Sequence, residues 1–153
     1  MENILEVQKK AFLKEGPPSL EKRTDLLKRC VALIETHQEK IIKALNQDFQ
    51  NRSVDEIKIS EIDQTVRNIL FTIKKLNKWM QPQRRFSSLG TDILGAKSFL
   101  QPSPLGTVGI IAPWNFPVGL IFYPLASIFA AGNRAMVKPS EITPATANII
   151  KEG

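Results

Sequence analysis

The sequence predicts an α/β chain in which a helical N-terminal part precedes a strand, a helix and a second strand. Two observations support this fold class. Residues 1–85 place apolar side chains at helical spacing and hold 17 basic and 12 acidic residues, whereas residues 86–153 hold only 4 and 3. Residues 98–133 carry no formally charged side chain, which is typical of strands buried on both faces and of the helix that connects them.

The composition is that of an ordinary globular domain. The chain has 153 residues, of which 42% are hydrophobic and 24% charged. Its net charge of +6 comes from basic residues interleaved with acidic ones, which favours a solvated helical surface over a nucleic-acid interface. With one cysteine, Cys30, and one histidine, His37, the sequence excludes an intrachain disulfide and predicts no metal site. The first twenty residues lack a secretory signal's apolar region, so we expect a cytoplasmic location.

Residues 1–85 are expected to form the N-terminal helical part. Pro17-Pro18-Ser19 separates a short first helix from a second one, with Ser19 as its N-cap. Ser53-Val54-Asp55-Glu56 fits a capping box, and the apolar period after it predicts one long helix from there to Met80. Pro82 ends that helix. Cys30 falls on the second helix, where a buried structural role is expected.

The second half is predicted to change from helices to strands. Residues 86–104 form a linker, with a hairpin over residues 91–101 turned at Gly95. Residues 105–153 then give a strand at 106–112, a helix at 117–131 and a strand at 135–137. Pro117 suits the first position of that helix and Gly132 the position after its end.

Two further predictions concern the uncharged run and the end of the chain. Five prolines and four glycines interrupt the run, so it contains no uninterrupted apolar stretch of the length that spans a membrane. Thr143 and Pro144 predict the N-cap and first position of a last helix.

Polar side chains follow both predicted strands, where open parallel sheets bind ligands. Asn115 follows the first strand, and its uncharged amide could donate to a developing oxyanion; equally, it could only close a turn before Pro117. Lys138 and Glu141 follow the second strand and could hold a ribose, or could form only an exposed ion pair. Neither standard glycine-rich phosphate loop is present.

Three motifs stand in a specific order: PLGTVGIIAPWNFP at 104–117, AAGN at 130–133 and KPSE at 138–141. With these motifs the chain resembles the aldehyde dehydrogenase superfamily. Further segments at 11–13, 17–19, 48–49 and 78–82 are similar to its class-3-type branch, and most closely to coniferyl aldehyde dehydrogenases. The resemblance covers nearly the whole chain but only about the first third of a family member. It implies that residues 105–153 open a Rossmann-like NAD(P)-binding domain that is cut short, giving an incomplete aldehyde dehydrogenase fold.

The resemblance also implies roles for individual residues. Asn115 would match the family's oxyanion donor, which binds the oxygen of the thiohemiacetal formed when a cysteine thiolate attacks an aldehyde. Lys138 and Glu141 would bind the adenosine ribose of NAD or NADP, with Ser140 beside them. The residues expected to line the cofactor cleft are Ile111, Ala112, Pro113 and Trp114.

The family's nucleophilic cysteine and its general-base glutamate lie beyond position 153. We therefore expect this chain to be inactive alone, as a fragment of an enzyme that oxidises an aldehyde, such as coniferyl aldehyde, to a carboxylic acid. The resemblance implies a homodimeric parent, and the exposed edges of a two-strand sheet predict that the fragment self-associates. Two alternatives remain: a natural truncated partner or decoy subunit, and a non-enzymatic basic protein that binds membrane surfaces.

Overall fold

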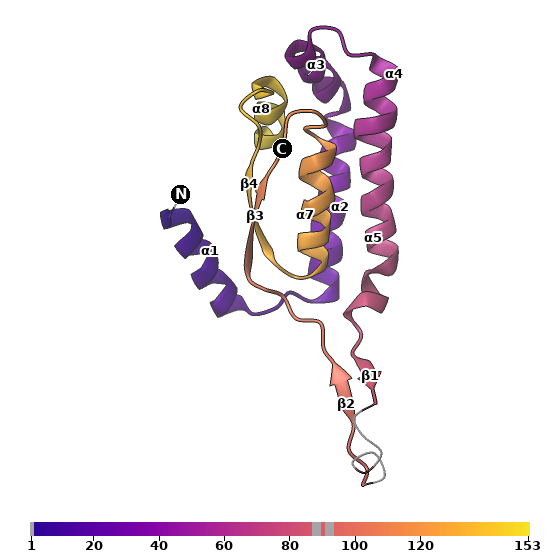
Figure 1. Ribbon diagram of the computed structural model, residues 1–153. Coiled ribbons are helices and arrows are strands. Elements are labelled where there is room, and N and C mark those ends of the chain that lie inside the picture. Colours follow the sequence, from indigo (N-terminus) through magenta and orange to yellow (C-terminus); the bar gives the residue numbers. More distant parts are fainter. Residues whose placement is uncertain (1, 87–89, 91–93) are drawn as a thin grey trace.

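The computed structural model describes residues 2–86, 90 and 94–153, and it has the mixed α/β character that the sequence predicts. Most of these residues are helical, and the strands form two small sheets (Figure 1). The helices are α1 (Glu2–Glu15), α2 (Leu20–Thr36), α3 (Gln38–Phe49), α4 (Val54–Ile57), the π-helix η1 (Lys58–Asp63), α5 (Gln64–Met80), α7 (Gly119–Ala130) and α8 (Pro144–Glu152). The strands are β1 (Gln83–Arg85), β2 (Ser98–Leu100), β3 (Thr107–Ile111) and β4 (Arg134–Lys138).

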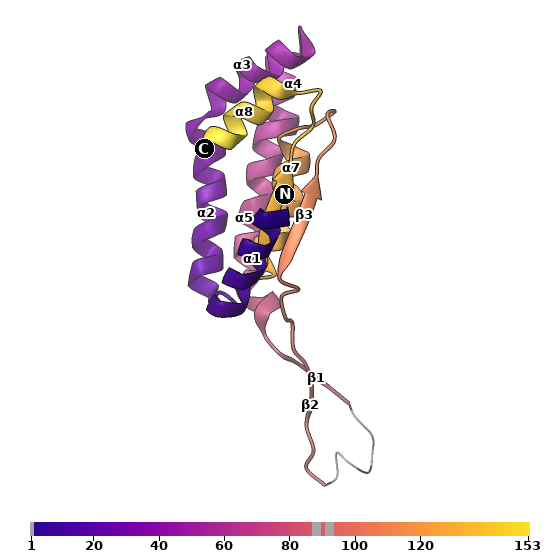
Figure 2. The ribbon, with the colours of Figure 1, turned by 90° about the vertical axis from the view of Figure 1, so that its left-hand side faces the viewer.

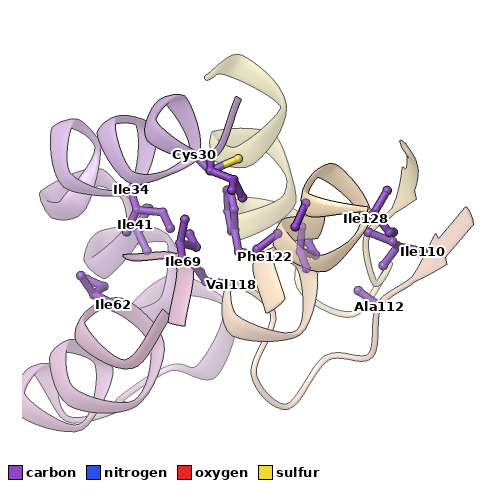
Figure 3. Packing of buried hydrophobic residues seen from close by; sticks show 14 of the residues in the cluster. Cys30, Ile34, Ile41, Ile62, Ile69, Ile110, Ala112, Val118, Phe122 and Ile128 are labelled. Carbon is purple, nitrogen blue, oxygen red and sulfur yellow. The ribbon is translucent and has the colours of Figure 1, made fainter. Parts of the chain in front are cut away.

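The core lies where α2 and α5 pack against α7 (Figure 1). Apolar side chains that recur at helical spacing on these three helices point into one cluster (Figure 3). Its fully buried members include Leu27, Ile34, Ile69, Leu76, Ile121 and Phe122. The cluster holds α7 in place, and α7 in turn fixes where the loop before it leaves the sheet.

Strands β3 and β4 pair in parallel, and α7 connects them, so the predicted strand, helix and strand are confirmed. The expected burial of both strands is wrong. Ile110 is buried, but the neighbouring Ile111 is 83% exposed and Val137 is 38% exposed. In the described part of the chain this sheet has only two strands, so no further strand covers its edges.

Helix α1 lies on the opposite side of β3 and β4 from α7 (Figures 1 and 2). None of its residues is buried, and Leu13 is 81% exposed. Polar contacts tie it to β4: Arg134 donates to Gln8 over 3.0 Å and pairs with Glu15 at 2.7 Å. Its half-buried Phe12 also lies near Gly106 at the start of β3, so polar and apolar contacts together attach the helix.

An antiparallel hairpin forms, but its strands are 83–85 and 98–100 and not two halves of residues 91–101 turned at Gly95. Strand β2 pairs antiparallel with β1, which precedes the predicted linker, and the resulting arm projects away from the helices (Figures 1 and 2). Residues 91–93 of the predicted hairpin lie outside the described residues. Gly95 does occupy a turn, with a φ of 84° that suits glycine.

The long helix predicted over residues 54–80 is helical throughout but not uniformly α-helical. The π-helix η1 interrupts it, and this turn has i→i+5 rather than i→i+4 geometry. Within this segment Ile59 is 62% exposed, whereas Glu61 is fully buried. The helix ends at Met80, two residues before Pro82, as predicted.

The connecting helix also starts later than predicted. Helix α7 begins at Gly119 rather than at Pro117, which lies in the turn before it. The predicted glycine after the helix is confirmed: Gly132 follows Ala131 with a φ of 85°. None of the described helices is long and apolar enough to cross a membrane.

The two predicted serine caps differ in the structure. The Ser19 hydroxyl accepts a hydrogen bond from the Lys22 amide at 3.2 Å, as predicted. Ser53 stands at an N-cap position, but its side chain makes no cap hydrogen bond, and Glu56 pairs with Arg52 instead of closing a capping box. The predicted capping box is therefore wrong, because the Arg52 guanidinium draws the glutamate away.

This difference gives a matched pair of mutations. We expect Ser19→Ala to lower the free energy of unfolding by about 1 kcal/mol, because the Lys22 amide loses its acceptor. Ser53→Ala should change it by less than about 0.5 kcal/mol, since no cap bond is lost. Urea unfolding of both variants measures these values, and equal losses would contradict the assignment of the caps.

Candidate functional site

The carboxyl ends of the two parallel strands lie side by side. Ile111 is the register partner of Lys138, and the Ala112 amide donates to the Lys138 carbonyl over 3.0 Å. The segment 113–117 after β3 and the segment 139–142 after β4 therefore leave the sheet next to each other. This is the place where open parallel sheets bind ligands.

Asn115 lies exposed on the segment after β3, which we call the Asn115 loop (residues 113–117). The alternative role, a turn closed by a hydrogen bond from the amide of residue 117 to the Asn115 side chain, is not possible here. Pro117 has no amide hydrogen, and the amides of Val118 and Gly119 donate to Glu61 instead. Within the described part of the chain the side-chain amide of Asn115 has no hydrogen-bond partner, so its two N–H donors remain available.

Two charged residues that sequence reasoning missed support this loop. Glu61 accepts from Val118 and Gly119, and Arg52 pairs with Glu61 at 2.9 Å. Burial raises the pKa of Glu61, while the hydrogen bond from Gly119 and the charge of Arg52 oppose that rise. A signal for Glu61 was present in the sequence, because an acid four residues after Ile57 and four before Thr65 falls on the buried face of a helix.

Lys138 and Glu141 form an ion pair at 2.5 Å, with side chains 50% and 79% exposed. The hydrogen bond from Lys138 holds the pKa of Glu141 below its usual range. Ser140 is buried between them and accepts from the Ile142 amide at 3.2 Å, which fixes the turn. The structure thus brings the three predicted ribose residues together: Lys138 and Glu141 as an exposed ion pair, and Ser140 buried in the turn between them.

An apolar groove of about 1020 Å³ runs beside these residues, between α2, α7 and α8. Lys138, Ser140 and Glu141 line one end of it. Cys30 lies in its wall, and burial raises the pKa of this thiol to about 11, so the thiol stays protonated near neutral pH. Cys30 therefore has none of the properties of a nucleophile, in agreement with the structural role expected for it.

The residues predicted to line the cofactor cleft differ in exposure. Ile111 is 83% exposed, Trp114 is 50% exposed and Pro113 is exposed, while Ala112 is buried. The Trp114 ring leans against Phe49, with ring centroids 6.3 Å apart. None of these residues, nor Asn115, lines the groove beside Glu141. Ile111, Pro113 and Trp114 form a separate exposed apolar surface at the end of β3.

The last helix is capped by a residue from far away in the sequence. Thr143 occupies the predicted N-cap position of α8 but makes no cap hydrogen bond. The carboxylate of Asp48 accepts from the Ala145 amide at 3.0 Å, from the Thr146 amide at 2.8 Å and from the Thr146 hydroxyl at 2.7 Å. This contact positions α8 and with it the turn that carries Lys138 and Glu141.

Comparison with known proteins identifies the family. Residues 1–152 match the aldehyde dehydrogenase family. The chain is 47% identical to a probable coniferyl aldehyde dehydrogenase of Caulobacter vibrioides and 42% identical to the coniferyl aldehyde dehydrogenase of a Pseudomonas species, covering 99% and 98% of this chain. The structure superposes on the substrate-bound state of Staphylococcus aureus AldH with a TM-score of 0.89, 32% identity and 99% coverage of this chain.

The matches cover nearly all of this chain but only about a third of each relative. The chain spans 31% and 30% of the two coniferyl aldehyde dehydrogenases, and 33% of the Staphylococcus aureus protein. The structure matches over nearly its full length, so the likeness extends to the helices, the sheet and both loops at its carboxyl edge. The chain belongs to the aldehyde dehydrogenase family.

Proposed function

We propose that this chain forms the first third of an NAD(P)-dependent aldehyde dehydrogenase and supplies its oxyanion donor. The observation that carries the proposal is the free amide of Asn115, presented on an exposed loop at the carboxyl end of β3 in a chain of this family. An amide with both N–H groups available suits the binding of a developing negative charge, because it donates without carrying a charge of its own.

The chemistry proposed for Asn115 follows from that donor. A cysteine thiolate contributed from outside this chain adds to the aldehyde carbon, and the π electrons of the carbonyl move onto its oxygen. The Asn115 amide donates to that oxygen and lowers the energy of the transition state. Cys30 does not suit the role of nucleophile, because burial raises the pKa of its thiol to about 11 and keeps the thiol protonated near neutral pH. The chain is therefore inactive alone.

The cofactor proposal rests on the turn after β4. The Lys138 ammonium donates and the Glu141 carboxylate accepts, so the adjacent pair can hold both hydroxyls of a ribose, and its exposure leaves it open to a ligand. The exposed side chains of Ile111 and Trp114 offer an apolar surface on the neighbouring strand. These residues fit NAD or NADP. A bound NAD or NADP would supply the hydride acceptor for the oxidation, and hydrolysis of the resulting thioester by water would give the carboxylic acid and release the cysteine.

The proposed substrate is an aromatic aldehyde of the coniferyl type, which is what the names of the two similar enzymes support. The test is to incubate the complete protein that contains this chain with coniferyl aldehyde and NAD+ or NADP+, and to measure the carboxylic acid formed by mass spectrometry. We expect acid from the complete protein and none from residues 1–153 alone. A medium-chain aliphatic aldehyde in parallel reactions compares kcat/KM between substrate classes.

Absence of any acid with every aldehyde and both cofactors would overturn the proposal. A higher kcat/KM for the aliphatic aldehyde would retain the dehydrogenase and overturn only the coniferyl assignment. Acid formed by residues 1–153 alone would contradict the view that the nucleophile lies outside this chain.

A further inference from the structure

A buried ion pair lies directly behind the Asn115 loop. Glu61 belongs to the π-helix η1, and its side chain is fully buried among residues of the apolar core. A carboxylate in such a place is costly unless charged or hydrogen-bonding partners compensate for the lost water. Within the π-helix Glu61 faces inward, whereas Ile59 faces out.

Both oxygens of the Glu61 carboxylate are used. Oε2 accepts from the Val118 amide at 3.1 Å and from the Gly119 amide at 2.9 Å, which are free donors at the start of α7. Oε1 accepts from Nη1 of Arg52 at 2.9 Å. The carboxylate therefore joins the N-terminus of α7, where negative charge is favourable, to a guanidinium on a different segment.

Arg52 continues this connection to the loop itself. Its Nη1 also donates to the backbone carbonyl of Asn115 at 3.2 Å, and its side chain is only 7% exposed. The guanidinium lies over the ring of Phe116, 4.8 Å from the centroid, and over that of Phe49 at 5.1 Å. Its position is thus fixed by ion pairs with Glu61 and Glu56, a backbone carbonyl and two aromatic faces.

From these contacts we infer that Arg52 and Glu61 are positioning residues for Asn115, an inference that rests on the proposed oxyanion role of that amide. The pair holds the loop at the Asn115 carbonyl and again at Val118 and Gly119, on both sides of Pro117. The backbone of Asn115 is restrained while its side-chain amide stays free to donate. Neither charged group reaches the reacting atoms itself, so both act through the orientation of Asn115.

The size of the effect follows from the geometry of donation. An oxyanion donor works only when its N–H lies at hydrogen-bond distance from the oxygen, and a displacement of about 1 Å can cost on the order of 10²-fold in rate. We expect Glu61→Gln and Arg52→Met to lower kcat by about 10-fold to 10²-fold. The KM values for aldehyde and cofactor should change by less than about 3-fold, because the pair touches neither ligand.

Conservative variants separate the hydrogen bonds that Glu61 accepts from the loop amides from its ion pair with Arg52. Glutamine can still accept from the Val118 and Gly119 amides through its carbonyl oxygen, but its amide group then faces Arg52 as a donor and cannot pair with it. Arg52→Lys keeps a positive charge that can pair with Glu61, but it lacks the Nε–H that donates to Glu56 and the planar face that lies over the Phe116 ring. We expect Arg52→Lys to recover part of the kcat lost in Arg52→Met.

A matched control is available on the next helix. Arg67 is exposed and donates to the Asp63 carbonyl at 3.2 Å within its own helical segment, with no link to the loop. We expect Arg67→Met to leave kcat unchanged. All variants are made in the complete protein, and their urea unfolding curves verify that each is folded. If Glu61→Gln does not fold, the Arg52→Met and Arg52→Lys pair decides the question.

A double-mutant cycle provides the readout that a purely structural role would not change. Adding Glu61→Gln to Asn115→Ala should lower kcat by less than about 3-fold further, because no donor remains to be misplaced. A second loss as large as in the wild-type background would overturn the inference. So would unchanged kcat in both Glu61→Gln and Arg52→Met when Asn115→Ala lowers it. If Asn115→Ala itself leaves kcat unchanged, the proposed function of Asn115 fails first.

Discussion

Asn115→Ala in the complete protein is expected to lower kcat for aldehyde oxidation by about 10²-fold to 10³-fold, equivalent to about 3 kcal/mol of transition-state stabilisation. The reason is that the amide donates to the carbonyl oxygen only as negative charge develops on it. The structure leaves both N–H groups of this amide without a partner in the described residues. Steady-state kinetics with the preferred aldehyde measures the effect.

The expected pattern distinguishes this role from a defect in folding or binding. The KM of the cofactor should stay within about 3-fold of wild type, because the donor acts in the chemical step. Asn68→Ala, which removes an exposed asparagine from α5, serves as the control and should leave kcat unchanged. An unchanged kcat in Asn115→Ala would remove this residue from the mechanism.

Gly132→Ala is expected to destabilise the protein by about 3 kcal/mol. Gly132 has a φ of 85°, and a Cβ added there would lie 2.6 Å from Cζ of Arg23. Arg23 cannot move aside freely. It donates to the Ala130 carbonyl at 2.9 Å and to the Pro18 carbonyl at 2.9 Å, and it is only 7% exposed. Displacing it would leave a helix-end carbonyl without its donor.

Gly16→Ala is the matched control. Gly16 has a φ of 70°, but no atom lies within 4 Å of an added Cβ. That substitution adds backbone strain alone, which we expect to cost about 1 kcal/mol. Urea unfolding of both variants measures the difference. Equal losses at the two positions would mean that Arg23 relocates without cost, which would contradict the structural importance of its two hydrogen bonds.

Much of the fold could be predicted because it depends on neighbouring residues. Apolar periods predicted α2 and the run from α4 to α5, Ser19 predicted a cap, and Gly132 predicted the end of α7. The order of strand, helix and strand also followed from the uncharged run. The polar residues at the strand ends, Asn115 and Lys138 with Glu141, could be named from their place after each strand.

The wrong cap predictions have different causes. Ser53 lacks its capping box because Glu56 pairs with the neighbouring Arg52, whereas at Thr143 the distant Asp48 accepts from the first amides of α8. The predicted long helix also did not anticipate the π-helix η1. The burial of β3 and β4 was overestimated for another reason. A run of apolar residues indicates that a strand favours burial, but it does not show whether other elements pack over that strand.

What the sequence determined by itself is therefore the order of elements, the family and the candidate residues at the edge of the sheet. Only the tertiary structure decided how these residues are held. Glu61 accepts from amides 57 and 58 positions away, Asp48 caps α8 across 97 and 98 positions, and Arg23 reaches a carbonyl 107 positions away. Periodicity and caps arise from bonds between near neighbours along the chain, whereas these buried polar contacts exist only once packing has removed water from both partners.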